Sequence, residues 1–232
     1  MVTNAVVLHL SVVLIATSLV ASFADAAVVP PLACQTAVEM SSTVDLKWTS
    51  EDVRRFRQEA ERVWTALGID VCWRDARTPC DHAAVTLHVR VADDVPSTGP
   101  STRRALGWIG FSDVGGPGPF IVLSVRRAIE LLGSAERAAR RLAELPGMVR
   151  RLLPRALGRA LAHELGHYLL ARRAHSRAGL MREAFRPEDL ADDGAGQRMQ
   201  LGAGDRRALL LRCAPRPVGL TADASASTAS PK

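Results

Sequence analysis

Lysine, tyrosine and long apolar stretches are all scarce in this chain of 232 residues. Its only lysines are Lys47 and Lys232, so nearly all of the 30 basic residues are arginines, and they are scattered among 24 acidic residues. Nucleic-acid-binding proteins typically gather basic residues on one face or in one tract, and aromatics that could stack on bases make up only 4% of this chain. The net charge of +6 therefore indicates a solvated arginine surface and no nucleic-acid partner.

The one long apolar stretch lies near the N-terminus. Residues 6–20 have the length of a signal-peptide core, and residues 24–26 (Ala-Asp-Ala) offer a small-x-small cleavage site. We expect residues 1–26 to be a signal peptide and the protein to be secreted or periplasmic, with no stable membrane insertion after cleavage. Because no Lys or Arg precedes the apolar stretch, a retained N-terminal anchor is the alternative. Residues 27–213 suit one domain with a sizeable core, and the Pro-, Ala- and Ser-rich residues 214–232 are expected to be disordered.

The four cysteines are an even number in a chain that is expected to be exported. This combination indicates two disulfides. Cys72 and Cys80 bracket a short polar excursion between two predicted strands, so we expect them to pair with each other. The pairing that is left joins Cys34 to Cys213 and would tie the two ends of the domain together.

Hydrophobic periodicity predicts a mixture of strands and helices. A capping box of Thr49 and Asp52 begins a helix whose apolar residues recur at helical spacing as far as Gly68. Residues 44–48 are expected to end a first strand, alternating apolar residues predict strands at residues 69–73 and 85–91, and two further strands are predicted at residues 106–111 and 120–125. Further helical stretches are predicted at residues 125–132, 134–145, 148–153, 154–172 and 205–212. The first three of these, separated by glycine or Pro-Gly, suggest an inserted helical hairpin.

The segment His163-Glu164-Leu165-Gly166-His167 carries the strongest chemical signal. A helix advances about 100° per residue, so the two histidines lie one turn apart on one face. Zinc accepts neutral imidazole nitrogens, and the carboxylate of Glu164 can reach the water at an open coordination position and act as general base. A buried helix that merely carries these residues is the weaker interpretation, because buried polar groups need partners.

The motif lies in the predicted helix at residues 154–172. Pro154 stands at its expected first position, where the missing N–H costs nothing. Gly158 and Gly166 each cost about 1 kcal/mol relative to alanine in a helix interior, so they indicate close approach of another backbone. Two histidines leave zinc short of a protein ligand, and a further ligand is therefore expected downstream.

His175 and Met181 follow this helix. With the helical motif they give the chain a likeness to a known family. It resembles the metzincin zinc peptidases, most closely their matrixin-like members, in which a third histidine follows the helical motif and a methionine turn lies beneath the metal. The resemblance implies that His163, His167 and His175 bind Zn²⁺, that Glu164 is the base and that Met181 forms the Met-turn.

The third histidine departs from the spacing of that family. The usual pattern is HExxHxxGxxH, with a glycine ending the helix, whereas this chain has Leu170 at the glycine position and His175 two residues late. A longer loop would have to spread the chain reversal over more residues. A carboxylate from Glu183, Glu188 or Asp189 is therefore the alternative third ligand, because two histidines and a carboxylate form another common catalytic zinc set.

The order of predicted elements is similar to the N-terminal half of metzincin catalytic domains. The likeness implies an α+β fold in which a small twisted mixed sheet packs on helices, one of them the zinc-binding helix. It also implies that residues 106–111 form the sheet edge above that helix, where a peptide would add as an antiparallel strand along Gly107, Trp108, Ile109 and Gly110. The alternative is that the glycines merely accommodate a bulge.

Together these patterns predict an exported zinc-dependent endopeptidase that acts on a peptide or protein substrate. One alternative is a zinc peptidase whose third ligand is a carboxylate. The other, from a different functional class, is an exported binding protein that keeps a zinc site without turnover.

Overall fold

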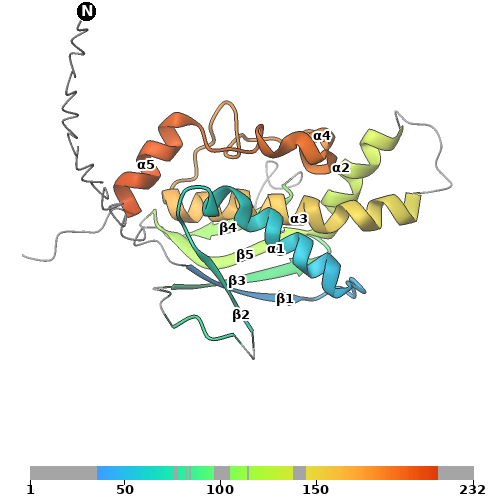
Figure 1. Ribbon diagram of the computed structural model, residues 1–232, viewed down its shortest axis with the longest axis horizontal. Helices are drawn as coiled ribbons and strands as arrows, with labels where there is room; N and C mark the ends of the chain where they lie inside the picture. The colour runs from blue at the N-terminus through green and yellow to red at the C-terminus, as the bar shows by residue number, and fades with distance from the viewer. Residues whose placement is uncertain are drawn as a thin grey trace, which may run out of the picture. The chain divides into compact units, whose positions relative to one another are not determined.

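The computed structural model describes residues 36–75, 78–81, 83, 85–96, 105–113, 115–137 and 145–213 (Figure 1). All of these ranges belong to one unit of the chain, Pro31–Lys232. The predicted signal peptide, Cys34 and residues 214–232 lie outside them, so the expectations for these segments stay predictions. Within the described ranges, no helix has both the length and the apolar character needed to cross a membrane.

Five strands form one mixed sheet. They are Thr36–Ser42 (β1), Val71–Arg74 (β2), Val85–Ala92 (β3), Gly107–Phe111 (β4) and Pro117–Ser124 (β5). Their order across the sheet is β2-β1-β3-β5-β4. The first four in this order pair in parallel, and β4 pairs with β5 in the antiparallel direction at one edge. Together with the helices, this sheet confirms the expected α+β class.

The first strand is not where the sequence predicted it. It occupies Thr36–Ser42, and residues 44–48 have no regular secondary structure. β1 pairs on both sides with strands that follow much later in the chain, so its position depends on non-local pairing more than on its own residue pattern. Val44 and Trp48 still pack against the core, which explains why the end of a strand was expected there.

Helix α1 (Ser50–Thr65) begins where its capping box predicts. Thr49 Oγ1 accepts a hydrogen bond from the Asp52 N–H at 3.2 Å, and Asp52 Oδ2 accepts one from the Thr49 N–H at 2.9 Å. Phe56 and Trp64, eight residues apart, are fully buried. The helix therefore presents one apolar stripe to the interior, as its periodicity predicted.

Two helices follow the sheet where three short helical segments and a separate motif helix were predicted. Helix α2 (Val125–Arg137) runs through Gly133, and helix α3 (Leu145–Leu170) runs through residues 146–147 and Pro154. The prediction that Pro154 begins a helix is therefore wrong. Proline removes one helical hydrogen bond, but α3 packs against α1, α2 and the sheet, and this burial stabilises the helix across the proline.

Figure 1 shows α1 and α3 side by side on one face of the sheet. Gly158 lies where these helices are in close contact: a Cβ atom on this residue would lie 2.5 Å from the Phe56 carbonyl oxygen and 2.9 Å from Glu59 Cβ. The close backbone approach predicted at Gly158 is thus confirmed. It fixes the position of α3, and hence of the histidine motif, over the sheet.

The remaining elements are helix α4 (Pro187–Ala191), a short 3-10 helix (Asp193–Gly196) and helix α5 (Ala203–Cys213). The predicted disulfide between Cys72 and Cys80 is present, with Cα atoms 5.9 Å apart. Cys213 is buried and disulfide-bonded. Because Cys34 lies outside the described residues, the pairing of Cys34 with Cys213 stays a prediction.

Candidate metal centre

The histidine helix ends in a turn that uses alanine where glycine is usual. Ala171 has a φ of 48°, in the left-handed region. Its N–H donates to the Tyr168 carbonyl at 3.0 Å, and the Arg172 N–H donates to the His167 carbonyl at 3.2 Å, which is the Schellman pattern of a helix C-terminus. Ala171 thus makes the turn that the family pattern assigns to glycine, one residue later in the chain.

This turn brings His175 back to His163 and His167. One nitrogen from each ring lies within 4.8 Å of those from the other two rings. The ring centroids of His163 and His167 are 4.6 Å apart, and that of His175 lies 5.3 Å and 4.9 Å from them. His163 and His167 are buried, whereas His175 is exposed. The three histidines singled out in the sequence therefore form a group able to hold a metal ion.

The backbone fixes the orientation of both buried rings. His163 Nδ1 lies 2.7 Å from the Leu180 carbonyl oxygen, and His167 Nδ1 lies 2.8 Å from that of Arg172. A carbonyl oxygen only accepts, so Nδ1 carries the proton in each ring, and Nε2 of the neutral imidazole keeps a free lone pair. Such contacts are typical of histidines that bind metals.

The two Nε2 atoms of His163 and His167 lie 3.0 Å apart. Two lone pairs that face each other at this distance repel unless a cation lies between them. Tetrahedral zinc, with Zn–N bonds of about 2.0–2.1 Å, would hold two ligand nitrogens about 3.3 Å apart. The donor set therefore fits a metal ion that takes neutral imidazole ligands, after a small adjustment of the rings.

The pKa values of these histidines also favour metal binding. Burial, followed by the influence of His167, lowers the pKa of His163 to about 3. Burial is also the main cause that lowers the pKa of His167 and of His175. Because an imidazole must be neutral to bind a metal, these shifts keep the nitrogens available below the usual histidine pKa of about 6.5.

Glu164 lies between the histidine helix and strand β4. A Cβ atom on Gly107 would lie 2.6 Å from Glu164 Cγ and 2.7 Å from Oε1, so the glutamate side chain packs directly on the strand backbone. Burial raises the pKa of Glu164 to about 8. The absence of a side chain at Gly107 is thus what leaves room for this carboxyl group against the strand.

No known protein family, curated protein or solved structure matches the chain.

Met181 lies beneath the histidine helix. Its side chain is fully buried, and it contacts the backbone of Gly166, where a Cβ atom would overlap its sulfur. The Ser176 N–H donates to the Met181 carbonyl at 2.6 Å, which closes the loop after His175. The close approach predicted at Gly166 is real, but the neighbour is the side chain of Met181 and not a backbone.

A buried acid that the sequence analysis did not single out holds the loop that carries His175. Asp205, near the start of α5, accepts hydrogen bonds from Ser176 Oγ at 2.8 and 3.1 Å and from the guanidinium of Arg172. It thereby ties both sides of His175 to α5, and Arg172 also supplies the carbonyl that orients His167. In the sequence Asp205 is an ordinary first-turn acid of a helix, so no local signal marks it.

The three acids considered as alternative ligands do not belong to the histidine group. Asp189 is buried and engaged with Arg182 at 2.8 Å and Arg198 at 3.2 Å. Glu183 and Glu188 are exposed. His175 is therefore the side chain that the fold brings to the two helical histidines.

Strand β4 has the edge position that the family likeness implied and an irregularity of the kind that its glycines suggested. It lies at an edge of the sheet, and its pairing with β5 shifts register between Ile109 and Phe111, which places a bulge at Gly110. A Cβ atom on Gly110 would lie 3.0 Å from the ring of Trp108. Gly107, the first residue of the edge strand, contacts Glu164, the residue that follows His163 in the chain.

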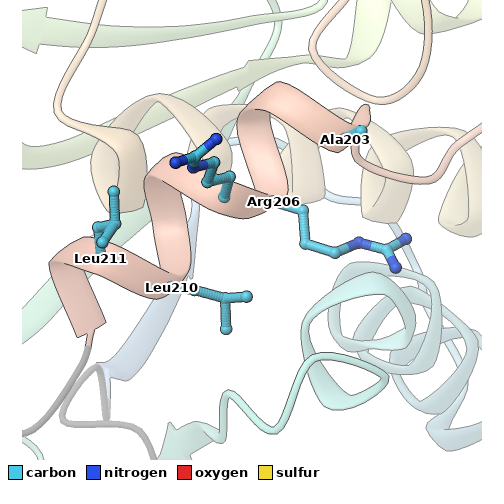
Figure 2. A pocket seen from close by; sticks show the side chains of 5 residues that line it. Ala203, Arg206, Leu210 and Leu211 are labelled. Carbon is cyan, nitrogen blue, oxygen red and sulfur yellow. The ribbon is translucent and has the colours of Figure 1, made fainter.

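A surface hollow of about 480 Å³ lies elsewhere, on α5 (Figure 2). Its described lining residues are Ala203, Arg206, Arg207, Leu210 and Leu211. None of them belongs to the histidine group, and a single helix supplies all of them. The hollow therefore has no part in the chemistry discussed below.

Proposed function

We propose that the chain is an exported zinc metallopeptidase of the metzincin type that cleaves internal peptide bonds. The observation that carries the proposal is a group of three histidines, two of them fixed in orientation on a helix whose buried Glu164 packs on the edge strand β4. The disulfide between Cys72 and Cys80 supports an oxidising, extracytoplasmic location.

His163, His167 and His175 would hold the zinc ion. The Leu180 and Arg172 carbonyls would keep the rings of His163 and His167 in a fixed orientation. When bound, zinc polarises a scissile carbonyl and lowers the pKa of water. The three rings fix the geometry around the ion, and the acid–base step belongs to a different side chain.

Glu164 would take the proton of the attacking water and deliver it to the leaving amine. A general base must be ionised, and without a nearby cation burial keeps the pKa of this carboxyl at about 8. A cation held by His163 and His167 would favour the ionised carboxylate. Glu164 is therefore poised to act as a base only when the metal is present.

The substrate would lie along β4. An edge strand has backbone groups that a peptide can pair with, and β4 starts beside Glu164. A peptide paired antiparallel to Gly107–Phe111 would bring one of its own carbonyl groups to the histidine group. Main-chain pairing of this kind accepts many sequences, so specificity would come from neighbouring side chains.

The test combines metal analysis with a peptide-library digest of the purified mature protein. We expect one zinc ion per chain and cleavage of internal bonds. The Glu164→Gln variant should keep its zinc and lose activity by at least about 10²-fold, because an amide cannot accept the proton. A wild-type protein that binds zinc and cleaves nothing would favour the exported binding protein instead, and near-normal turnover in Glu164→Gln would refute the mechanism.

The third ligand is tested separately. His175→Ala should weaken zinc binding by more than the 10- to 100-fold loss that is typical when a residue contacting a ligand is changed. Glu183→Ala and Glu188→Ala serve as controls and should bind zinc as the wild type does. The opposite result would assign a carboxylate as the third ligand and exclude the metzincin type.

A further inference from the structure

Two consecutive arginines lie in the loop between His167 and His175, and they have different partners. Arg172 is paired with the buried carboxylate of Asp205. Arg173 is exposed and turns toward the sheet: its guanidinium lies 5.0 Å from the centroid of the Phe111 ring and contacts the Phe111 carbonyl oxygen at 3.4 Å. Phe111 is the last residue of β4, so Arg173 connects the histidine loop to the far end of the edge strand.

The charge of Arg173 is not neutralised by an ion pair within the described part of the chain. This distinguishes it from Arg172 and from Arg182, which pairs with Asp189 at 2.8 Å. A guanidinium carries five N–H donors, and its contact with one carbonyl and one aromatic face leaves most of them available. Arg173 therefore presents a fixed positive charge at the end of the strand.

The direction of β4 determines which part of a substrate would meet this charge. β4 runs from Gly107, beside Glu164, to Phe111, and a strand rises about 3.3 Å per residue, so the two ends lie about 13 Å apart. A peptide antiparallel to β4 has its N-terminal side toward Phe111. With the scissile bond near Glu164, the residue that reaches Arg173 is about four positions N-terminal to that bond.

We propose that Arg173 makes the enzyme selective for peptides with Asp or Glu about four residues N-terminal to the scissile bond. This inference rests on the proposed peptidase function and adds the substrate class to it. A carboxylate at that position would accept hydrogen bonds from the guanidinium while the peptide backbone pairs with β4. The aromatic ring of Phe111 holds the guanidinium in place, so little side-chain freedom is lost on binding.

The test uses a matched set of peptides with one common cleavage site. Asp, Asn or Lys is placed in turn at each position from two to six residues N-terminal to the scissile bond, and kcat/KM is measured for each. For the wild type we expect the Asp peptide to exceed the Asn peptide by about three- to fivefold, at the fourth position or its neighbours, because an exposed ion pair contributes little. The ratio should fall toward one as salt is raised.

Variants then assign the preference to one side chain. Arg173→Gln should remove the difference between the Asp and Asn peptides, Arg173→Glu should favour the Lys peptide, and Arg173→Lys should retain part of the Asp preference. Arg177→Gln is the matched control, because Arg177 is an exposed arginine two residues after His175, and it should behave like the wild type.

Each outcome has a definite meaning. Cleavage without an Asp preference, or a preference that survives Arg173→Gln, would overturn the assignment of Arg173 and leave the peptidase function standing. A wild-type enzyme that cleaves no peptide of the set and no member of a random library would overturn the peptidase function, and the substrate class with it.

Discussion

Met181 fills the space that a side chain on residue 166 would need. The glycine of the histidine motif and the methionine after His175 are therefore complementary in shape, and both are fully enclosed by the core. Because Gly166 lies between His163 and His167, this contact supports the helix turn that presents both rings.

Gly166→Ala should lower the free energy of unfolding by about 1–3 kcal/mol, which is the usual cost of overpacking a core. It should also weaken metal binding, since the methionine or the helix must shift. Gly147→Ala is the matched control on the same helix: nothing lies within 4 Å of a Cβ atom there, and alanine favours helix, so this variant should be as stable as the wild type or slightly more so. Urea denaturation and zinc competition would measure both effects.

Ala171→Gly should raise the free energy of unfolding by about 0.5–1 kcal/mol. The left-handed conformation of Ala171 costs about 1–2 kcal/mol for a residue with a side chain, and the extra freedom of glycine in the unfolded chain offsets part of the gain. Ala174→Gly, in the same loop but without a positive φ, should instead destabilise by about 0.4–1 kcal/mol. Equal effects of the two changes in chemical denaturation would contradict the strain assigned to Ala171.

Gly107→Ala should leave zinc bound but reduce kcat by about 10²-fold. The new methyl group would displace the Glu164 carboxyl group, and a catalytic group misplaced by about 1 Å can lose about 10²-fold in rate. Gly116→Ala, where the nearest atom lies 3.8 Å away, should have near-normal kinetics. Steady-state kinetics with metal analysis would test the pair. Normal turnover in Gly107→Ala would mean that Glu164 is not held by β4 during the reaction.

Asp205→Asn should weaken zinc affinity by about 10- to 100-fold, because the loop with His175 and the carbonyl partner of His167 would lose its anchor. Cobalt substitution gives a readout that simple destabilisation would not change, since the visible absorption reports ligand geometry. Glu59→Gln is the control: Glu59 is also paired with a buried arginine, Arg159, but lies on α1 away from the loop. It should reduce stability without changing the cobalt spectrum.

Two buried groups, His163 and Glu164, should change the stability of the metal-free protein with pH in opposite directions. The pKa of His163 is about 3 in the folded chain against about 6.5 unfolded, so its contribution to stability is complete above about pH 6.5 and is lost as the pH falls toward 3. The pKa of Glu164 is about 8 against 4.5, so its contribution is complete below about pH 4.5 and is lost as the pH rises through 8.

Glu164→Gln should therefore flatten the decline in stability of the metal-free protein between pH 5 and pH 9. The difference from the wild type should reach a few kcal/mol at the alkaline end, because one pKa unit corresponds to about 1.4 kcal/mol. Urea titrations at several pH values in the presence of a chelator would measure it. Parallel curves for the two proteins would show that Glu164 ionises freely when the protein is folded.

Local sequence patterns predicted the structural features that depend on interactions between residues close together in the chain. The capping box of Thr49 and Asp52 began α1 where expected, and the spacing of Cys72 and Cys80 identified a disulfide. The strand β1 was missed because its position is set by pairing with two strands that come later in the chain. The start of α3 was misplaced because burial along the helix outweighs the local cost of Pro154.

The same distinction applies to the candidate site. The spacing of His163 and His167 on one helix face is a local property, and it was predictable. The approach of His175 depends on a left-handed alanine, which no residue preference would suggest, and the role of Asp205 depends on the packing of α5. Gly107 was expected to admit a substrate backbone, which stays a prediction, and its role in making room for Glu164 was not foreseen.

One continuous stretch, residues 163–180, contains all three histidines and both carbonyls that orient them. The neighbour of the proposed base, Gly107, comes from a strand far earlier in the chain. In the proposed mechanism, the metal ligands would come from this stretch alone, whereas turnover would also depend on β4. Changes at Gly107 in β4 should then leave metal binding without hydrolysis, whereas loss of any of the three histidines should abolish both properties together.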